Sequence, residues 1–175
     1  MSFSFANIDV ELPLDIALFR SEIPFDSHQS YSMFYPYFDM GPVRVLYEFN
    51  NFMPDSKWTF SAGGGIIVWP FQSLAASGRA SFNLCNFKNG GSLDLATTID
   101  AGIFALFQRY YDVTNGSKTV KAYLSPALGC SLDIFYSNKE KMPFYFGGGI
   151  SCGGTSLYNS IMILYAINLT VGFRI

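Results

Sequence analysis

Apolar and polar residues alternate along almost the whole chain, and this period of two strongly limits what the chain can fold into. Successive side chains of a β-strand point to opposite faces, whereas a helix repeats every 3.6 residues, so the pattern indicates strands throughout. Several predicted strands are as long as the roughly 9–11 residues with which a tilted strand crosses a bilayer. The pattern predicts eight strands, over residues 6–20, 30–50, 57–71, 74–88, 92–110, 119–136, 143–154 and 160–175.

The second predicted strand contains a break signal at Gly41-Pro42 and could be divided into two strands. One odd-numbered apolar phase nevertheless continues across this point, which favours one long strand and an even number of strands. The residues in this phase are Tyr31, Met33, Tyr35, Tyr37, Val43, Val45, Tyr47 and Phe49.

The two faces of the predicted strands differ sharply in chemistry. One face is apolar and bulky, and Asp39 is its single charge: it carries Ile8, Val10, Leu12, Leu14, Ile16, Leu18, Trp58, Phe60, Ala62, Ile66, Val68, Phe82, Leu84, Leu93, Leu95, Ile99, Ile103, Phe107, Val120, Leu124, Leu128, Leu132, Ile134, Phe144, Phe146, Ile150, Ile161, Ile163, Tyr165, Ile167, Leu169, Val171 and Phe173. The other face holds charges of both signs: Asp9, Glu11, Asp15, Arg44, Glu48, Lys57, Arg79, Asp94, Asp100, Lys121, Asp133 and Arg174. A soluble barrel would have to bury the bulkier face in an interior that eight strands only just enclose. We therefore expect the apolar face to meet lipid and the charges to pair in a lumen.

Composition supports a membrane barrel over the alternative, a soluble all-β protein. Charged residues make up 14% of the chain, against roughly 25% in soluble domains. No run of about 20 apolar residues offers a helical membrane span, and the net charge of −2 gives no basic surface for nucleic acid. We predict an all-β fold, an eight-stranded antiparallel up-and-down transmembrane β-barrel that forms a single domain over residues 1–175.

The ends of the chain suggest a topology. The start lacks the basic segment of a signal peptide, so we expect that a leader has been removed. With both ends in the periplasm, periplasmic turns fall at residues 51–56, 89–91 and 137–142, and extracellular loops at 21–29, 72–73, 111–118 and 155–159. This topology gathers an aromatic girdle near one interface, made of Tyr47, Phe49, Trp58, Phe144, Phe146 and Phe173.

The alternating segment 163–175 resembles the terminal strand of bacterial outer-membrane barrels, although that strand usually ends in an aromatic residue and here the last residue is Ile175, with Phe173 two residues before it. The predicted size is similar to the small barrels typified by the OmpW, OmpX and OmpA-transmembrane families. The resemblance implies a bacterial outer-membrane, multi-pass protein. It also implies two partners, the lipid bilayer and the barrel-assembly machinery, which recognises the terminal strand.

The predicted lumen divides by height. The periplasmic end collects Asp9, Glu11, Arg44, Glu48, Lys57, Asp94, Asp133 and Arg174, with Asp15 and Asp100 nearer the middle. The extracellular end collects Phe34, Phe38, Ile67, Trp69, Phe104, Leu106, Met162 and Leu164, with Arg79 and Lys121 as basic exceptions. Paired charges would hold a filled barrel shut, because buried charges are costly unless they are paired.

The apolar end allows two interpretations. OmpW-like barrels have a hydrophobic pocket open to the outside, and the resemblance implies a narrow channel or binding pocket for small hydrophobic molecules. Alternatively, these side chains pack together and close a structural surface barrel that has no transport role.

Glycines, Pro126 and the cysteines have mainly structural interpretations. Gly63-Gly64-Gly65 and Gly147-Gly148-Gly149 lie within strands and predict bends, with a lateral opening or ligand space as the alternative. Pro126 predicts a bulge on the lipid face. The three cysteines, Cys85, Cys130 and Cys152, lack metal-ligand spacing and are expected to be free thiols, although a Cys130–Cys152 pairing stays open.

Catalysis has weak support in the sequence. His28 and Ser30, with Glu22 nearby, supply the residue types of a base, a nucleophile and an acid. Small barrels with lipid A deacylase activity use a similar set, but on a late strand and in another order. We predict no enzyme, no catalytic residue, no metal and no cofactor, with a lipid-modifying enzyme as the minor alternative.

Overall fold

The computed structural model describes residues 8–25, 31–40, 43–49, 56–67, 72–112, 117–138, 141–157 and 160–175. Within the strands it leaves aside the side chains of residues 15, 17, 18, 20, 31–40, 67, 72, 73, 104–112, 117–123 and 157. The described residues form strands β1 (Ile8–Pro24), β2 (Tyr31–Met40), β3 (Val43–Phe49), β4 (Trp58–Ile67), β5 (Gln72–Asn86), β6 (Gly91–Asp112), β7 (Ser117–Asn138), β8 (Phe144–Leu157) and β9 (Ser160–Arg174).

The strands close into one antiparallel ring. Neighbours in sequence are neighbours in the sheet from β3 to β9, and β9 pairs with β1. Both β2 and β3 pair with β1, one with its second half and the other with its first half, so together they occupy one position in the ring. The prediction of eight antiparallel up-and-down strands is therefore confirmed. The prediction of one long second strand with a single odd-numbered phase is wrong, because β1 pairs Leu14 with Met40 but Glu11 with Arg44, which leaves one extra residue between β2 and β3. Reciprocal backbone hydrogen bonds between Ile8 and Ile175, at 2.9 and 3.4 Å, complete the closure.

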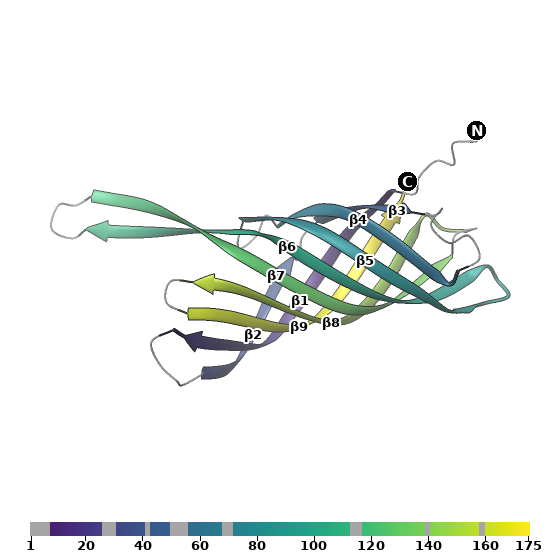
Figure 1. Ribbon diagram of the computed structural model, residues 1–175, viewed down its shortest axis with the longest axis horizontal. Helices are drawn as coiled ribbons and strands as arrows, with labels where there is room; N and C mark the ends of the chain where they lie inside the picture. The colour runs from purple at the N-terminus through teal and green to yellow at the C-terminus, as the bar shows by residue number, and fades with distance from the viewer. Residues whose placement is uncertain are drawn as a thin grey trace.

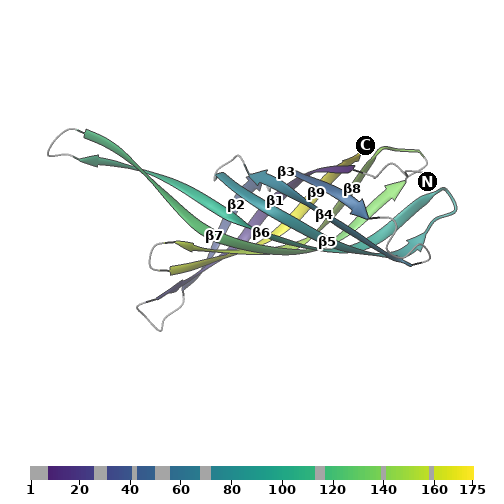
Figure 2. The same ribbon diagram turned by 45° about the horizontal axis from the view of Figure 1, so that its top comes forward.

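The two ends of the barrel differ in shape. Ile8 and the C-terminus lie at one end, called the terminal end below, together with the tight β5–β6 turn (Figure 1). In that turn Gly90 adopts a φ of 82°, a conformation that glycine accepts without strain. At the opposite end, called the hairpin end, the β6–β7 hairpin projects well beyond the other strands (Figures 1 and 2). Beyond Ala105, the described residues of this hairpin pair only with each other.

The apolar face predicted to meet lipid points outward, which confirms the separation of faces. Leu124, Leu128 and Ile150 are 72%, 67% and 63% exposed, and the aromatic residues predicted as a girdle all lie exposed near the terminal end. Most buried inward positions are instead small or polar, as in the alternation of buried Asn168 and Thr170 with exposed Leu169 and Val171 on β9. No helix in the described part of the chain is long and apolar enough to cross a membrane.

The first strand departs from the predicted phase at Leu18. Ala17 and Phe19 pair with consecutive residues of β9, so Leu18 is an extra residue, and Pro36 of β2 lies beside the same irregularity. A bulge shifts the later residues by one and exchanges their faces. The prediction that even-numbered residues stay outward through Leu18 therefore fails beyond Ala17, where Phe19 and Ile23 are exposed instead.

Several predicted loops and one predicted bulge are wrong. Residues 21–24, 72–73 and 155–157 belong to strands, because inter-strand pairing continues farther than the apolar alternation suggests. Pro126 keeps a regular register with Ile103 and forms no bulge. The β7–β8 ladder ends at Ala127, so the missing proline N–H falls where that ladder has ended.

Candidate functional site in the lumen

The centre of the described lumen is a buried ion pair between Glu11 on β1 and Arg79 on β5. The two strands are separated in the sheet by β3 and β4, so the pair spans the lumen. The guanidinium binds both carboxylate oxygens, with Nη2 2.6 Å from Oε2 and Nη1 in contact with Oε1. Glu11 is 0% exposed and Arg79 is 7% exposed. This bidentate geometry is the strongest form of an arginine–carboxylate contact.

Two further side chains complete the hydrogen bonding of this pair. The Tyr145 hydroxyl donates to Glu11 Oε1 at 2.5 Å, and Arg79 Nε donates to Thr98 Oγ1 at 3.0 Å. Thr98 is the direct cross-strand partner of Arg79 on β6. Because every partner comes from a different strand, this one cluster connects β1, β5, β6 and β8 through the interior.

An aromatic pair packs against these charges. Phe135 on β7 and Tyr145 on β8 meet edge to face, with ring centroids 5.6 Å apart, and the Arg79 guanidinium lies 4.8 Å from the Phe135 centroid. Glycines make room for both rings: Gly147 lies opposite Phe135, and Gly172 lies opposite Tyr145. A Cβ on Gly172 would lie 2.1 Å from the Tyr145 ring. The sequence pattern did not predict this aromatic pair, although an inward aromatic residue opposite a glycine was a signal for it.

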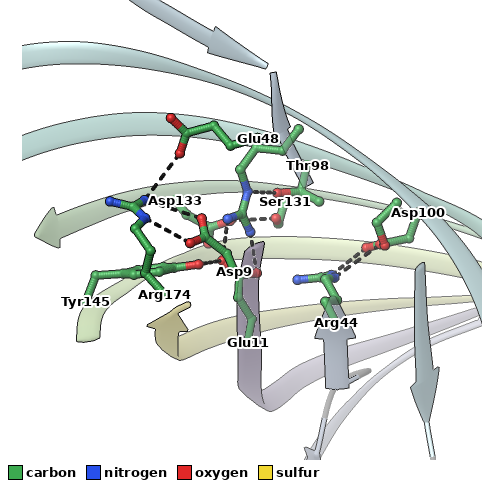
Figure 3. A network of polar contacts seen from close by, with 12 residues as sticks. Asp9, Glu11, Arg44, Glu48, Thr98, Asp100, Ser131, Asp133, Tyr145 and Arg174 are labelled. Carbon is green, nitrogen blue, oxygen red and sulfur yellow. Dashed lines mark hydrogen bonds and ion pairs between the residues drawn. The ribbon is translucent and has the colours of Figure 1, made fainter. Parts of the chain in front are cut away.

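A second ion cluster lies toward the terminal end. Arg174 on β9 donates to the carboxylate of Asp9 at 3.0 and 3.3 Å and to that of Glu48 at 3.4 Å (Figure 3). Asp9 is the cross-strand neighbour of Arg174, whereas Glu48 lies one strand farther along on β3. Arg174 also lies 5.6 Å from the centroid of the Tyr145 ring, so this cluster adjoins the central one.

A third pair joins Arg44 on β3 to Asp100 on β6. The contact has two hydrogen bonds of 2.5 and 3.2 Å, and Ser77 donates to the same carboxylate at 2.5 Å. It lies apart from the other two clusters in Figure 3. Like the central pair, it crosses two intervening strands, β4 and β5.

Asp133 is the least compensated acid of the described lumen. It is 1% exposed, and its Oδ2 accepts from Ser131 at 2.6 Å. Its Oδ1 has no hydrogen-bond partner within the described residues, and the same is true of Asn168 Oδ1. These two oxygens are buried polar atoms that the described interior leaves without a hydrogen bond.

A polar cavity of about 420 Å³ lies on the terminal-end side of the Glu11–Arg79 pair. Its walls include Asp9, Glu48 and Arg174, and its inner limit is formed by Arg79, Phe135 and Tyr145. Water can therefore reach the Asp9–Arg174–Glu48 cluster, whereas Glu11 does not line the cavity and the Glu11–Arg79 pair is almost fully buried at its inner limit.

The structure brings only part of the predicted charge network into contact. Asp9, Glu11, Arg44, Glu48, Asp100 and Arg174 make the contacts above, and the side chain of Asp15 lies outside the described residues. Asp94 accepts from Asn83 at 2.8 Å and from Ser92 at 3.2 Å. Lys57 is exposed at the cavity mouth with its ammonium 6.0 Å from the Phe82 ring.

Arg79 corrects the predicted heights. The sequence placed it among the apolar residues of the extracellular half, but it binds Glu11, predicted at the opposite end. Strands of a closed barrel are tilted and staggered, so residues counted equally far from strand ends need not share a height.

The predicted apolar pocket lies mostly outside the described side chains. Trp69 is outside the described residues, and Phe34, Phe38, Ile67, Phe104 and Leu106 are described in their backbone only. Met162 is inward and 6% exposed, and Leu164 is partly exposed two residues farther along β9. The candidate catalytic residues His28 and Ser30, and the side chain of Lys121, also lie outside the described part.

Two solved structures are similar to this chain, at low sequence identity. No family model and no curated protein matches the sequence. The chain is similar to the crystal structure of Neisserial surface protein A, with a TM-score of 0.49 and 12% identity over 98% of this chain and 97% of that one. It is also similar to the N-terminal β-barrel domain of OprF from Pseudomonas aeruginosa, with a TM-score of 0.41 and 12% identity over 97% of each chain.

Proposed function

We propose that this chain is a bacterial outer-membrane protein whose outer face contacts lipid. The support is the set of exposed Leu, Ile, Val and Phe side chains on the described outer face of a closed ring. Soluble monomers rarely expose apolar patches beyond a few hundred Å², whereas a closed barrel leaves no unpaired strand edge in hydrocarbon. The terminal end faces the periplasm, and the projecting β6–β7 hairpin stands on the cell surface.

Within that membrane we propose a structural barrel that is shut to ions and displays its hairpins outside. The observation that carries this proposal is the Glu11–Arg79 pair, which spans the lumen and is almost fully buried. The aromatic pair Phe135–Tyr145 fills the space beside it. An ion entering from the periplasmic cavity would have to displace a bidentate pair to pass.

Planar-bilayer conductance tests the closed lumen. The purified native protein is expected to give no steady single-channel current. Arg79→Ala combined with Glu11→Ala removes both charges and their volume, so it is expected to produce channels. Steady conductance of the native protein, at the same level as the double variant, would show that the pair does not close the pore.

A second candidate function is a blind pocket for small hydrophobic molecules, entered from outside. Met162 supports it, because this apolar side chain is inward and buried toward the hairpin end, whereas Asn168 and Thr170 are the buried residues nearer the terminal end. Uptake of a hydrophobic dye by cells is expected to fall in Trp69→Lys and Phe104→Lys variants. Unchanged uptake in both variants would leave only the structural role.

We further propose that the barrel-assembly machinery recognises the C-terminal strand and that the chain has no enzymatic activity. Phe173 is the aromatic residue nearest the end of that strand and is 49% exposed on its outer face. Phe173→Ser is expected to lower the amount of assembled barrel in cells. His28→Ala is expected to leave the lipid A of the host unchanged, and an altered lipid A would instead support the enzymatic alternative.

A further inference from the structure

Two of the three cysteines face each other across a strand pair. Cys130 on β7 and Cys152 on β8 are direct partners in the β7–β8 register. Both are free thiols in the structure; Cys130 is exposed and Cys152 is partly exposed, in the same outward phases as Leu128 and Ile150. Both thiols therefore lie on the outer face of the wall.

The register alone brings these residues within the reach of a disulfide. Directly opposed residues of an antiparallel pair have Cα atoms about 4.5 or 5.5 Å apart, according to their hydrogen-bonding class. Disulfides join Cα atoms separated by roughly 4.4–6.8 Å, so either class permits the bond. Cys85 has a different environment, because it lies on β5 opposite Leu93.

Because of the position of the pair, such a bond would hold β7 and β8 together near the end of their ladder. The β7–β8 ladder ends at Ala127 and Thr155, three residues beyond the two cysteines on each strand. From there β7 follows β6 into the projecting hairpin and leaves β8 behind (Figure 1).

Beside the two cysteines, few side chains are available to pack between β7 and β8. Gly129 and Gly153 pair with each other, and Gly154 follows on β8. Glycine contributes no side-chain packing to a strand. Gly129 and Gly153 lie in the inward phase, and among the described residues a Cβ built on Gly153 would have one heavy atom within 4 Å, the Leu128 carbonyl oxygen at 3.8 Å, so the lumen side of the wall is loosely filled here.

We propose that Cys130 and Cys152 form a cross-strand disulfide that fastens β7 to β8 just below the point where the hairpin leaves the barrel. The oxidant is a disulfide compound of the periplasm, which follows from the proposed location. One cysteine thiolate attacks that disulfide and releases one thiol. The second thiolate then attacks the resulting mixed disulfide and releases the other thiol. Two protein thiols are oxidised, one external disulfide is reduced to two thiols, and two protons leave the cysteines.

Intact-protein mass spectrometry tests this proposal with a defined oxidant. The full chain is folded into detergent micelles with oxidised glutathione, quenched in acid, denatured and treated with N-ethylmaleimide. The expected product carries one maleimide or one glutathione adduct, on Cys85, and yields a Cys130–Cys152 cross-linked peptide. Prior reduction is expected to give three maleimides, one for each cysteine of the chain. Because the oxidant is supplied, the result does not depend on the cellular location.

Cys85→Ser is the matched control and is expected to carry no maleimide before reduction. Cys130→Ser and Cys152→Ser each leave Cys85 and one cysteine of the proposed pair, so no disulfide of that pair can form. Each variant is expected to carry two labels or glutathione adducts. The midpoint temperature at which the folded band is lost on electrophoresis is expected to fall upon reduction of the native chain. It is expected to stay unchanged in Cys130→Ser.

Three outcomes would overturn the proposal. The first is three maleimide labels or glutathione adducts, in any combination, on the folded, oxidised protein. The second is a cross-link that contains Cys85, and the third is a disulfide between two copies of the chain. A bond that forms while reduction leaves the unfolding temperature unchanged would remove the fastening role and so also contradict the proposal as stated.

Discussion

At the scale of single residues, the effect of Glu11 on stability depends mainly on Arg79, and the effect of Arg79 depends mainly on Glu11. Each is nearly inaccessible to water, and each satisfies the other's hydrogen bonds. Removing one partner of a buried pair costs about 3–5 kcal/mol, because the remaining charge stays buried without compensation. Replacing both partners with apolar residues of similar volume is often nearly neutral.

A double-mutant cycle is therefore predicted to be strongly non-additive. Glu11→Leu alone should lower the free energy of unfolding by about 3–5 kcal/mol, and Arg79→Met alone by a similar amount. The double variant should lose much less than the sum of the two. Urea unfolding in lipid vesicles measures the cycle, with Asp94→Asn as a control at a partly exposed acid. Additive losses would mean that the two side chains are not coupled.

Glycine positions differ sharply in how much space surrounds them. A Cβ on Gly149 would lie 1.9 Å from the Leu132 carbonyl oxygen, so backbone would have to move. A Cβ on Gly78 would meet nothing within 4 Å. Gly149→Ala is predicted to destabilise the barrel by about 1–3 kcal/mol, the usual cost of overpacking. Gly78→Ala should be neutral or slightly stabilising, and equal effects in urea unfolding would refute this difference.

At the scale of elements, the β6–β7 hairpin is separable from the barrel. Residues 106–112 and 117–123 have backbone partners only in each other within the described part of the chain. Gln108 and Lys121 are one such pair. Deleting residues 109–120 and joining these two with Asn-Gly, a favoured two-residue hairpin turn, should preserve the fold.

Heat-modifiable electrophoresis measures this prediction. The shortened chain should show the same folded band and the same transition temperature as the native chain, because no barrel pairing is lost. A chain that no longer folds would show that the hairpin is needed to form the β6–β7 wall.

Strand faces could be predicted from sequence because the side-chain period of a strand is fixed at two. Leu128 and Ile150 illustrate this success, since an exposed apolar residue at each was expected and is present. Leu18 shows where the approach fails, because a single bulge residue reverses the phase and carries no composition signal. Strand ends such as 155–157 were also missed, since pairing continues through polar residues.

Contacts across the lumen were less accessible to prediction. The charge list contained both Glu11 and Arg79, but their pairing depends on the stagger of β5 against β1, which is set by closure of the whole ring. Tyr145 was missed because a tyrosine on a mixed face has no charge to mark it. Its role requires Gly172 opposite its ring, a long-range relation between two strands.

At the scale of the whole molecule, the usual arrangement of a globular protein is inverted. The described barrel has a polar interior with few buried apolar side chains, while its large apolar residues are outside. Stability in water would require that band to be covered. In a bilayer the same band is favourable, and the interior needs only matched charges and hydrogen bonds.

The most direct test of this inverted arrangement is quenching of a single tryptophan by lipids brominated on their acyl chains. Trp58→Phe and Trp69→Phe remove the native tryptophans. Ile150→Trp then places one probe at a residue that is 63% exposed on the outer face. In vesicles of brominated lipid the probe is predicted to be strongly quenched relative to vesicles of unbrominated lipid. Equal fluorescence in the two vesicles, from protein shown to be folded, would contradict an outer face in contact with lipid.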